Sequence, residues 1–310
     1  MIKINLKDFK SPPAVLFSLG AIKQIELAVR TTDGDTYTNI YYRDKAVLDR
    51  LRAISIHKST ISEKESGKCY YCESKIEHAA KLQVEHFRPK AKITKIDTGQ
   101  MDNNGYFWLG LEWSNLLLSC PICNRSKGNR FPIRGTRAVA QTPVDQHFCL
   151  DRTNCFAHQE PLISEKAILI NPEQDDPKDY FGFNLVGEIE PTSSDFERSD
   201  ASIKIYKLNR PALINERMKL WDQVVKDFDL DIANYEMGAE TWNDLSAHCR
   251  KICRKLIART AKEEEFSAWA TYLNEQILDF IIADIAEPYQ MLFFESYFSE
   301  LSRHIPRSQS

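Results

Sequence analysis

Two Cys-x-x-Cys pairs constrain the fold of this chain more than any other feature of its sequence. Cys69 pairs with Cys72 and Cys120 with Cys123, and 47 residues separate the two inner cysteines. A tight turn in each pair would aim two thiolates at one ion, and four thiolates complete the tetrahedral shell of a structural Zn²⁺. The alternative, four unrelated buried cysteines, requires two matched pairs to arise by chance. The spacing therefore predicts one four-cysteine zinc site with a long insert between its two halves.

The composition is that of a folded globular protein. Of 310 residues, 43% are hydrophobic and 27% are charged, and only 11 are Gly, which argues against disorder and favours helix over sheet. No apolar run approaches the roughly 20 residues of a membrane helix, and residues 1–10 lack the apolar core of a signal peptide. We therefore expect a cytoplasmic protein with no membrane partner. In that reducing compartment, the eight cysteines are metal ligands or buried thiols rather than disulfides.

Charge is distributed unevenly along the chain. The formal net charge is -3, yet residues 68–134 carry 11 Lys or Arg against 6 Asp or Glu. The rest of the chain has 30 basic and 38 acidic residues. The positive segment coincides with the paired cysteines, as expected of a module that contacts phosphate groups. The pattern therefore points to a nucleic-acid partner for this segment.

Hydrophobic periodicity divides the chain into regions. It predicts a helix over residues 42–56, a short strand over 167–170 and a hairpin over 181–189. After Pro211 the pattern becomes helical, with a capping box at Thr241 and further helices expected over 263–286 and 289–304. The predicted regions are an N-terminal lead-in with a helix (1–67), a core with the cysteine pairs (68–135), a connecting region with short strands (136–210) and a helical C-terminal region (211–310).

The insert between the cysteine pairs carries residues that resemble the motif of the HNH endonucleases, also called ββα-metal nucleases. His86 follows Glu85 in a Val-Glu-His-Phe-Arg-Pro segment, Asn115 lies in Trp-Ser-Asn-Leu, and Asn124 follows Cys123. Asn115 and Asn124 are nine residues apart, as in the family, and Asn replaces His at the third position. The resemblance implies an α+β fold, in which a ββα-metal HNH core sits on a four-cysteine zinc scaffold and a mainly α-helical region follows.

The resemblance also implies a role for each motif residue. His86 would be the general base that takes a proton from water, and Asn115 would hold its ring by hydrogen bonding. Glu85 and Asn124 offer hard oxygen ligands for the Mg²⁺ or Mn²⁺ that offsets charge on the scissile phosphate. Basic side chains around the motif are expected to bind substrate phosphates, namely Arg88, Lys90, Arg125, Lys127 and Arg130.

Two other cysteine groups have a weaker claim to metal. Cys249 and Cys253 lie four apart on a helix face that is otherwise Leu and Ile, so we interpret them as buried thiols. A second metal site is left open for a group whose spacing fits no common zinc pattern, formed by His147, Cys149, Cys155 and His158.

Segments outside the motif resemble a narrower family, the PtuB-like nucleases of Septu anti-phage systems and related retron operons. They include Lys-Cys-Tyr-Tyr-Cys-Glu at 68–73, Leu-Ile-Asn-Pro at 169–172 and Leu-Asn-Arg at 208–210. The match covers most of residues 40–220 and is less specific in the helical region. In that family the nuclease works beside an ABC-type ATPase. This sequence has no Walker A motif, so the resemblance implies that a partner binds the nucleotide.

These features predict a metal-dependent HNH endonuclease that cleaves or nicks nucleic acid in phage defence. DNA is the favoured substrate, and RNA such as tRNA is an alternative. A non-catalytic zinc module that binds nucleic acid for a partner, or an assembly subunit, would also fit, but neither needs the acid–base pair Glu85-His86. Aromatic and Met residues between Pro211 and about Ile305 predict a docking surface for the partner, with a self-contained helical bundle as the alternative.

Overall fold

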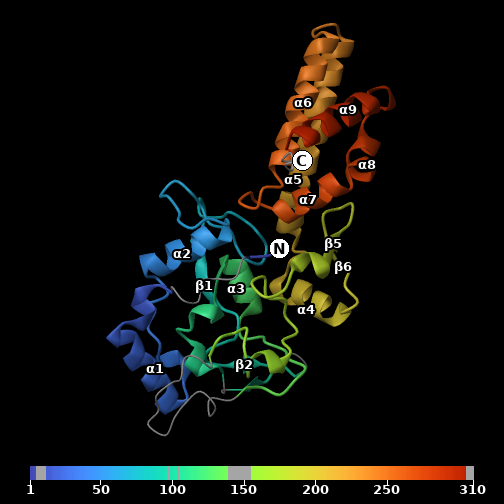
Figure 1. Cartoon of the computed structure of the whole chain (residues 1–310). Helices are drawn as coiled ribbons and strands as arrows, with labels where there is room; N and C mark the ends of the chain where they lie inside the picture. The colour runs from blue at the N-terminus through green and yellow to red at the C-terminus, as the bar shows by residue number, and fades with distance from the viewer. Residues whose placement is uncertain (5–11, 96–97, 103–104, 139–154, 305–310) are drawn as a thin grey trace, which may run out of the picture. The chain divides into compact units, whose positions relative to one another are not determined.

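A computed structural model describes residues 1–4, 12–95, 98–102, 105–138 and 155–304 of the chain (Figure 1). The described chain is a mixture of α-helices and small two-stranded sheets, as the α+β expectation requires. It forms two compact units. Unit 1 contains Met1–Phe181 and Glu190–Leu208, and unit 2 contains Gly182–Ile189 and Asn209–Ser310. The finer division into four regions stays a prediction.

Two capped helices open unit 1. Helix α1 (Leu19–Thr31) begins after Ser18, whose hydroxyl accepts a hydrogen bond from Ala21 N. Helix α2 (Lys45–Ser55) begins after Asp44, whose carboxylate accepts from two main-chain amides of the first turn. Such caps satisfy donors that the helix itself leaves unpaired, so they set where each helix begins. The helix predicted over 42–56 is confirmed, and it starts a little later than predicted because Asp44 is its cap.

The centre of unit 1 is a strand–strand–helix arrangement. Strands β1 (Gln83–His86) and β4 (Leu116–Ser119) pair antiparallel, with His86 opposite Leu116. Helix α3 (Pro121–Lys127) follows β4 at once, with Cys120 as its cap and Pro121 in its first turn. Proline suits that position because the first helical N–H has no partner within the helix. All four residues of β4 are buried, so the strand forms part of the core.

The remaining elements of unit 1 are short. Strands β2 (Ile93–Thr94) and β3 (Met101–Asp102) pair in the insert, and α4 (Phe196–Tyr206) lies near the end of the unit. Strands β5 (Phe181–Phe183) and β6 (Ile189–Pro191) form the predicted hairpin, whose loop belongs to unit 2. The strand predicted over 167–170 is wrong. Only Ala167 forms a β-bridge, to Ile133, and the apolar residues that follow it are buried but do not pair with another strand.

Glu165 links three segments inside unit 1. It is fully buried, and one of its oxygens lies 2.7 Å from Nε of Arg88, which follows β1. Its other oxygen accepts hydrogen bonds from the Tyr106 hydroxyl at 2.7 Å and from Ala138 N at 2.9 Å. The Arg88 guanidinium is also buried and donates to the carbonyl of Leu162. Buried charges are tolerated when they are paired in this way.

The substitution Glu165→Gln should lower the free energy of unfolding by about 3–5 kcal/mol, because it leaves the Arg88 guanidinium buried without an anion. Urea denaturation would measure this loss. Lys226→Ala is the matched control, since Lys226 forms a largely exposed pair with Asp222 that should contribute less than about 1 kcal/mol. Equal midpoints for the two variants would contradict a stabilising role for the buried pair.

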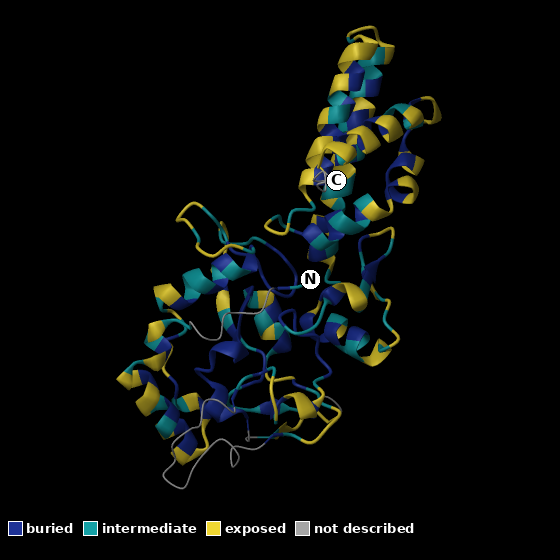
Figure 2. Ribbon diagram, in the orientation of Figure 1, coloured by how far each residue is buried: buried dark blue, intermediate teal, exposed yellow. Residues whose placement is uncertain are grey.

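Unit 2 is helical. Its long helices α5 (Pro211–Glu236) and α6 (Trp242–Ala258) carry buried and exposed residues on alternate faces (Figure 2). The predicted capping box is confirmed, since Thr241 and Asp244 exchange both hydrogen bonds. Helix α9 (Glu287–His304) matches the last predicted helix and packs against α6. None of the helices in the described part of the chain combines the length and the apolar composition needed to cross a membrane.

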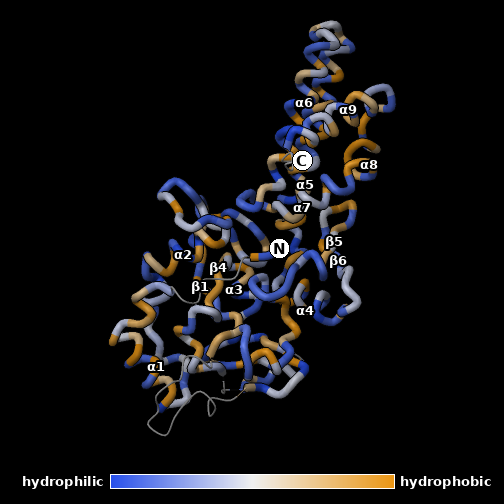
Figure 3. Tube along the Cα trace, viewed as in Figure 1, coloured by the Kyte–Doolittle hydropathy of each residue, from blue (hydrophilic) through white to orange (hydrophobic). Residues whose placement is uncertain are grey.

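The single helix predicted over 263–286 is wrong. The structure has α7 (Ser267–Glu275), α8 (Ile277–Phe280) and a 3-10 turn at Ile282–Asp284. Gln276 leaves helical geometry between the first two, with φ −112° and ψ 32°. The chain that follows is strongly apolar (Figure 3), and its Ile277, Phe280 and Ile281 are all buried. These positions (i, i+3 and i+4) would share one face of a straight helix as well, so their burial gives no reason for the break.

Candidate functional site

The four paired cysteines converge on one point of unit 1. All four are buried, and their sulfur atoms lie within 4.8 Å of one another. Cys72 Sγ is 3.8 Å from Cys120 Sγ, and none of the four forms a disulfide. A tetrahedron with Zn–S bonds of about 2.3 Å has edges of about 3.8 Å. The predicted four-cysteine cluster is therefore confirmed, and its spacing fits a tetrahedral thiolate site.

Local hydrogen bonds shape both halves of this cluster. In the first turn, Glu73 N donates to the carbonyl of Cys69, and Cys69 N donates to that of Ser74. In the second, Cys120 caps α3, and its sulfur accepts from Cys123 N at 3.4 Å. Main-chain N–H groups aimed at sulfur stabilise the thiolate form that a metal ligand requires. Tyr70 N donates to Leu118 O, which ties the first turn to β4.

His86 lies at the end of β1 and is half-buried. Its Nε2 is 2.9 Å from the carbonyl oxygen of Gly110, and the ring of Tyr42 meets the imidazole edge-on. Because a carbonyl can only accept, Nε2 carries the hydrogen, and Nδ1 of the neutral ring is an acceptor. Burial, the largest cause, together with the charges of Lys90 and Lys127, lowers the pKa of His86 to about 3. The imidazole is therefore neutral at pH 7, as a general base must be, and a pKa this low makes it a weak base in this state of the protein.

Glu85 and Asn124 each form a polar contact between β1 and α3. Glu85 Oε1 is 2.7 Å from Lys127 Nζ, and Asn124 Nδ2 donates to the side chain of Gln83 at 2.9 Å. Successive strand residues point to opposite faces, so Gln83 and Glu85 share the face toward α3. The ring of His86, the last residue of the strand, contacts Gly110 and Tyr42. Burial raises the pKa of Glu85, and the Lys127 ammonium opposes that shift.

Asn115 was predicted to hold the His86 ring by a hydrogen bond, but its side chain bonds main-chain groups instead. Its amide oxygen accepts from Arg88 N, and its amide nitrogen donates to the carbonyls of Arg88 and Leu109. Asn115 thus joins the main chain after His86 to the main chain before Gly110. Sequence reasoning missed Gly110, whose carbonyl bonds the ring. A Cβ at Gly110 would lie 2.2 Å from the Tyr37 ring, so only glycine fits there.

Two of the five predicted phosphate contacts are wrong, because both side chains are buried and engaged inside the protein. Arg88 is 1% exposed and bonds Glu165, and Lys127 is 0% exposed and contacts Glu85 and the carbonyl of His86. Lys90 is half-buried and donates to the carbonyl of Gly34. Arg125 and Arg130 are exposed. These two, with part of Lys90, are the predicted contacts that solvent can reach.

The other cysteine groups have separate outcomes. Cys249 and Cys253 are buried on α6, which confirms their interpretation as buried thiols. His147 and Cys149 lie outside the described residues, so the second metal site that would include them stays a prediction. Cys155 is buried and His158 half-buried.

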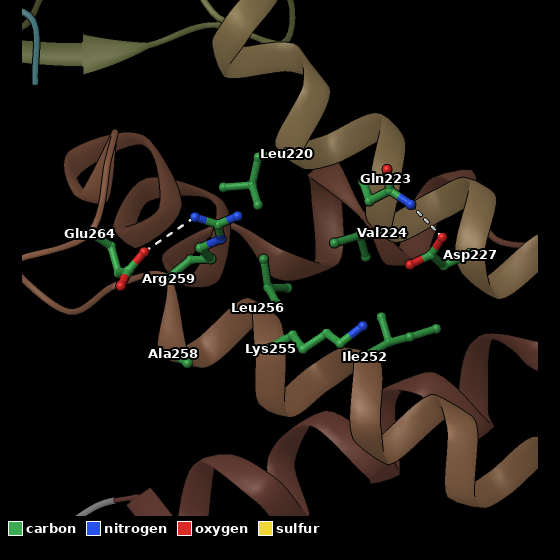
Figure 4. A pocket seen from close by; sticks show the side chains of 10 residues that line it. All are labelled: Leu220, Gln223, Val224, Asp227, Ile252, Lys255, Leu256, Ala258, Arg259 and Glu264. Atoms are coloured by element: carbon green, nitrogen blue, oxygen red, sulfur yellow. Dashed lines mark hydrogen bonds and ion pairs between the residues drawn. The ribbon is translucent and has the colours of Figure 1, made fainter. Parts of the chain in front are cut away.

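Unit 2 has a cavity of about 510 Å³ between α5 and α6 (Figure 4). Leu220, Val224 and Leu256 supply apolar walls, and Arg259 forms an ion pair with Glu264 at 3.2 Å at its edge. None of the predicted site residues lines this cavity. We therefore assign it no part in the chemistry of the His86 region.

Comparison with known proteins places the chain in a family. No family model and no solved structure matches it. It is 34% identical to Septu protein PtuB of Bacillus mycoides (strain KBAB4) over 238 residues, which are 74% of this chain and 69% of that protein. It is 39% identical over 72 residues to Septu protein PtuB of Bacillus thuringiensis, 23% of each chain. It is also 27% identical over 158 residues to Septu protein PtuA of the first organism, 51% of this chain but 20% of PtuA. The long first alignment shows that the chain belongs to the Septu PtuB family.

Proposed function

We propose that this protein is a metal-dependent HNH endonuclease that hydrolyses phosphodiester bonds in nucleic acid as the effector of an anti-phage defence system. The observation that carries the proposal is His86, a neutral, half-buried imidazole held at the end of β1 by the Gly110 carbonyl. It belongs to a strand–strand–helix arrangement that the cysteine cluster braces. DNA is the favoured substrate and RNA such as tRNA the alternative.

The zinc site would serve as the scaffold of this module. Cys69, Cys72, Cys120 and Cys123 would hold Zn²⁺ as four thiolates, which closes the shell and leaves no position for substrate. The shell connects the turn before β1 to the start of α3. A zinc ion there would therefore hold the strand and the helix that carry the motif residues.

The catalytic chemistry would belong to the motif residues. His86 Nδ1 would take a proton from the attacking water. Asn124 Oδ1 and the second oxygen of Glu85 are the groups that would hold Mg²⁺ or Mn²⁺, since Asn124 bonds Gln83 through its nitrogen and Glu85 faces Lys127 through Oε1. When bound, such an ion offsets negative charge on the phosphate and the leaving oxygen. Exposed Arg125 and Arg130 would bind flanking phosphates.

A second candidate is a zinc-containing module that binds nucleic acid or assembles with a partner without catalysis. The observation that favours it is the ion pair of Glu85 with Lys127, because a carboxylate that is already neutralised attracts a divalent ion less strongly. A protein of this kind would bind nucleic acid through its exposed arginines and leave it intact.

Incubation with DNA and with tRNA distinguishes the two candidates. We expect the purified protein, alone or with its ATPase partner, to cleave at least one of them when Mg²⁺ or Mn²⁺ is present and neither when EDTA replaces the ion. Binding of nucleic acid without cleavage under every condition would support the second candidate and contradict the first.

We further propose that an ABC-type ATPase docks on α9. Phe293 and Tyr297 are buried within unit 2, whereas Met291, Phe294 and Phe298 leave 64%, 37% and 38% of their surface exposed. The three exposed residues have the 3–4 residue spacing of one helical face, and Met and Phe are enriched in interface cores. Met291→Asp should weaken co-purification with the ATPase, and Leu230→Asp, at an exposed position of α5, should not. Unchanged co-purification of the Met291 variant would contradict docking there.

A further inference from the structure

Three metal-ligating side chains converge in unit 2, apart from the cysteine cluster. Asp231 lies in the last turns of α5, Glu240 in the connection after it, and His248 in α6. Nδ1 of His248 is 3.3 Å from an oxygen of Asp231 and 3.3 Å from an oxygen of Glu240. The three ligand atoms all lie within 4.8 Å of one another. We propose that they form a second Zn²⁺ site, with one imidazole and two carboxylates as protein ligands.

The distances suit ligands around an ion better than hydrogen bonds. A charge-assisted N–H···O bond measures about 2.7–2.9 Å, and a three-centre bond that shared one N–H between both oxygens would be weaker than such a bond. A tetrahedron with bonds of about 2.0–2.1 Å, the usual length for Zn²⁺ with nitrogen or oxygen, has edges of about 3.3–3.4 Å. His248 Nδ1 and the facing oxygen of Glu240 are shielded from solvent, and neither makes a hydrogen bond within the described chain. An ion at the central point would satisfy both of these atoms.

The charges around the site favour a cation. Neither Asp231 nor Glu240 has a Lys or Arg partner among the described residues, so two carboxylates face one imidazole without a permanent positive charge. Asp244, the next acidic residue, is engaged in the capping box with Thr241. The second oxygen of Glu240 accepts from Asn234 Nδ2 at 3.3 Å, an outer contact of the kind that orients a ligating carboxylate.

The site would join two helices. Its ligands come from α5, from the connection and from α6, so a bound ion would fasten the ends of this helical hairpin together. Three protein ligands leave a fourth position for water. The side chain of His248 is 44% exposed, which gives an ion a route from solvent.

Calorimetry on the full chain tests the proposal. Protein that retains its tightly bound zinc is dialysed free of loose metal and titrated with Zn²⁺. We expect one further equivalent of Zn²⁺ to bind. His248→Ala should lower the Zn²⁺ affinity by at least about tenfold, because loss of an outer contact to a ligand already costs that much and loss of the ligand itself costs more. Asp231→Asn should weaken binding too, whereas His78→Ala, at an exposed histidine of unit 1, should not.

Cobalt substitution identifies where the added ion binds. Co²⁺ at this site should give weak visible bands, and it should not give the intense sulfur-to-metal charge-transfer band of thiolate coordination. Absence of a further equivalent would overturn the proposal. A further equivalent that binds equally well to the wild type, His248→Ala and Asp231→Asn would overturn it as well.

Discussion

Replacement of His86 by Ala is expected to lower the rate of phosphodiester hydrolysis by about 10²–10⁴-fold, the usual contribution of a positioned general base. The imidazole contacts Gly110 and Tyr42 but is only half-buried and is not part of the hydrophobic core. The fold should therefore survive the change. Initial rates on the substrate that the wild-type protein cleaves would measure the loss. The content of tightly bound zinc and the thermal midpoint should remain those of the wild type.

His78→Ala is the matched control for this experiment. His78 is an exposed histidine of the same unit, eight residues earlier in the chain, and its removal should leave the rate unchanged. If His86→Ala retained the full rate, His86 would not be the general base. A fall in zinc content that paralleled the fall in rate would assign the effect to structure.

Replacement of Cys72 by Ser is expected to remove one equivalent of tightly bound zinc per chain and to unfold the region around β1 and α3. Binding of zinc contributes about 10–16 kcal/mol in small zinc modules, as much as the whole folding free energy of a typical domain, about 5–15 kcal/mol. Cys72 Sγ lies 3.8 Å from Cys120 Sγ, so its loss opens the shell between the two turns. Elemental analysis and urea denaturation would measure the two effects.

Cys253→Ser controls for the loss of a buried thiol as such. Cys253 is fully buried in α6, so its replacement should cost stability in unit 2 without changing the tightly bound zinc. The four-cysteine site would be contradicted if Cys72→Ser kept a full equivalent of zinc, or if the wild-type protein contained none and yet was folded.

The features that could be predicted from the sequence are those encoded by nearby residues. The cysteine pairs set two tight turns, the Thr241–Asp244 pair sets a helix start, and Pro211 opens α5. Each depends on contacts within a few positions of the chain. The break at Gln276 could not be predicted, because neither Gly nor Pro lies near it in the sequence.

The same distinction holds in the candidate site. Arg88 and Lys127 look like phosphate contacts because they flank the motif, but their partners are distant in sequence: Glu165 is 77 residues from Arg88, and Glu85 is 42 residues from Lys127. No local pattern marks either pair. Gly110 is another such residue, since only the packing of the Tyr37 ring reveals why glycine stands beside the imidazole.

The dependence of cleavage on added Mg²⁺ and Mn²⁺ tests the proposed chemistry most directly. The zinc-loaded wild-type protein should show a rate that rises to saturation with either ion and vanishes with EDTA. Asn124→Ala should need a higher concentration of Mg²⁺, with partial recovery in excess Mn²⁺, because it removes one oxygen ligand. Cleavage that proceeds without Mg²⁺ or Mn²⁺, or an Asn124→Ala protein with the wild-type metal dependence, would contradict catalysis by a metal ion held at β1 and α3.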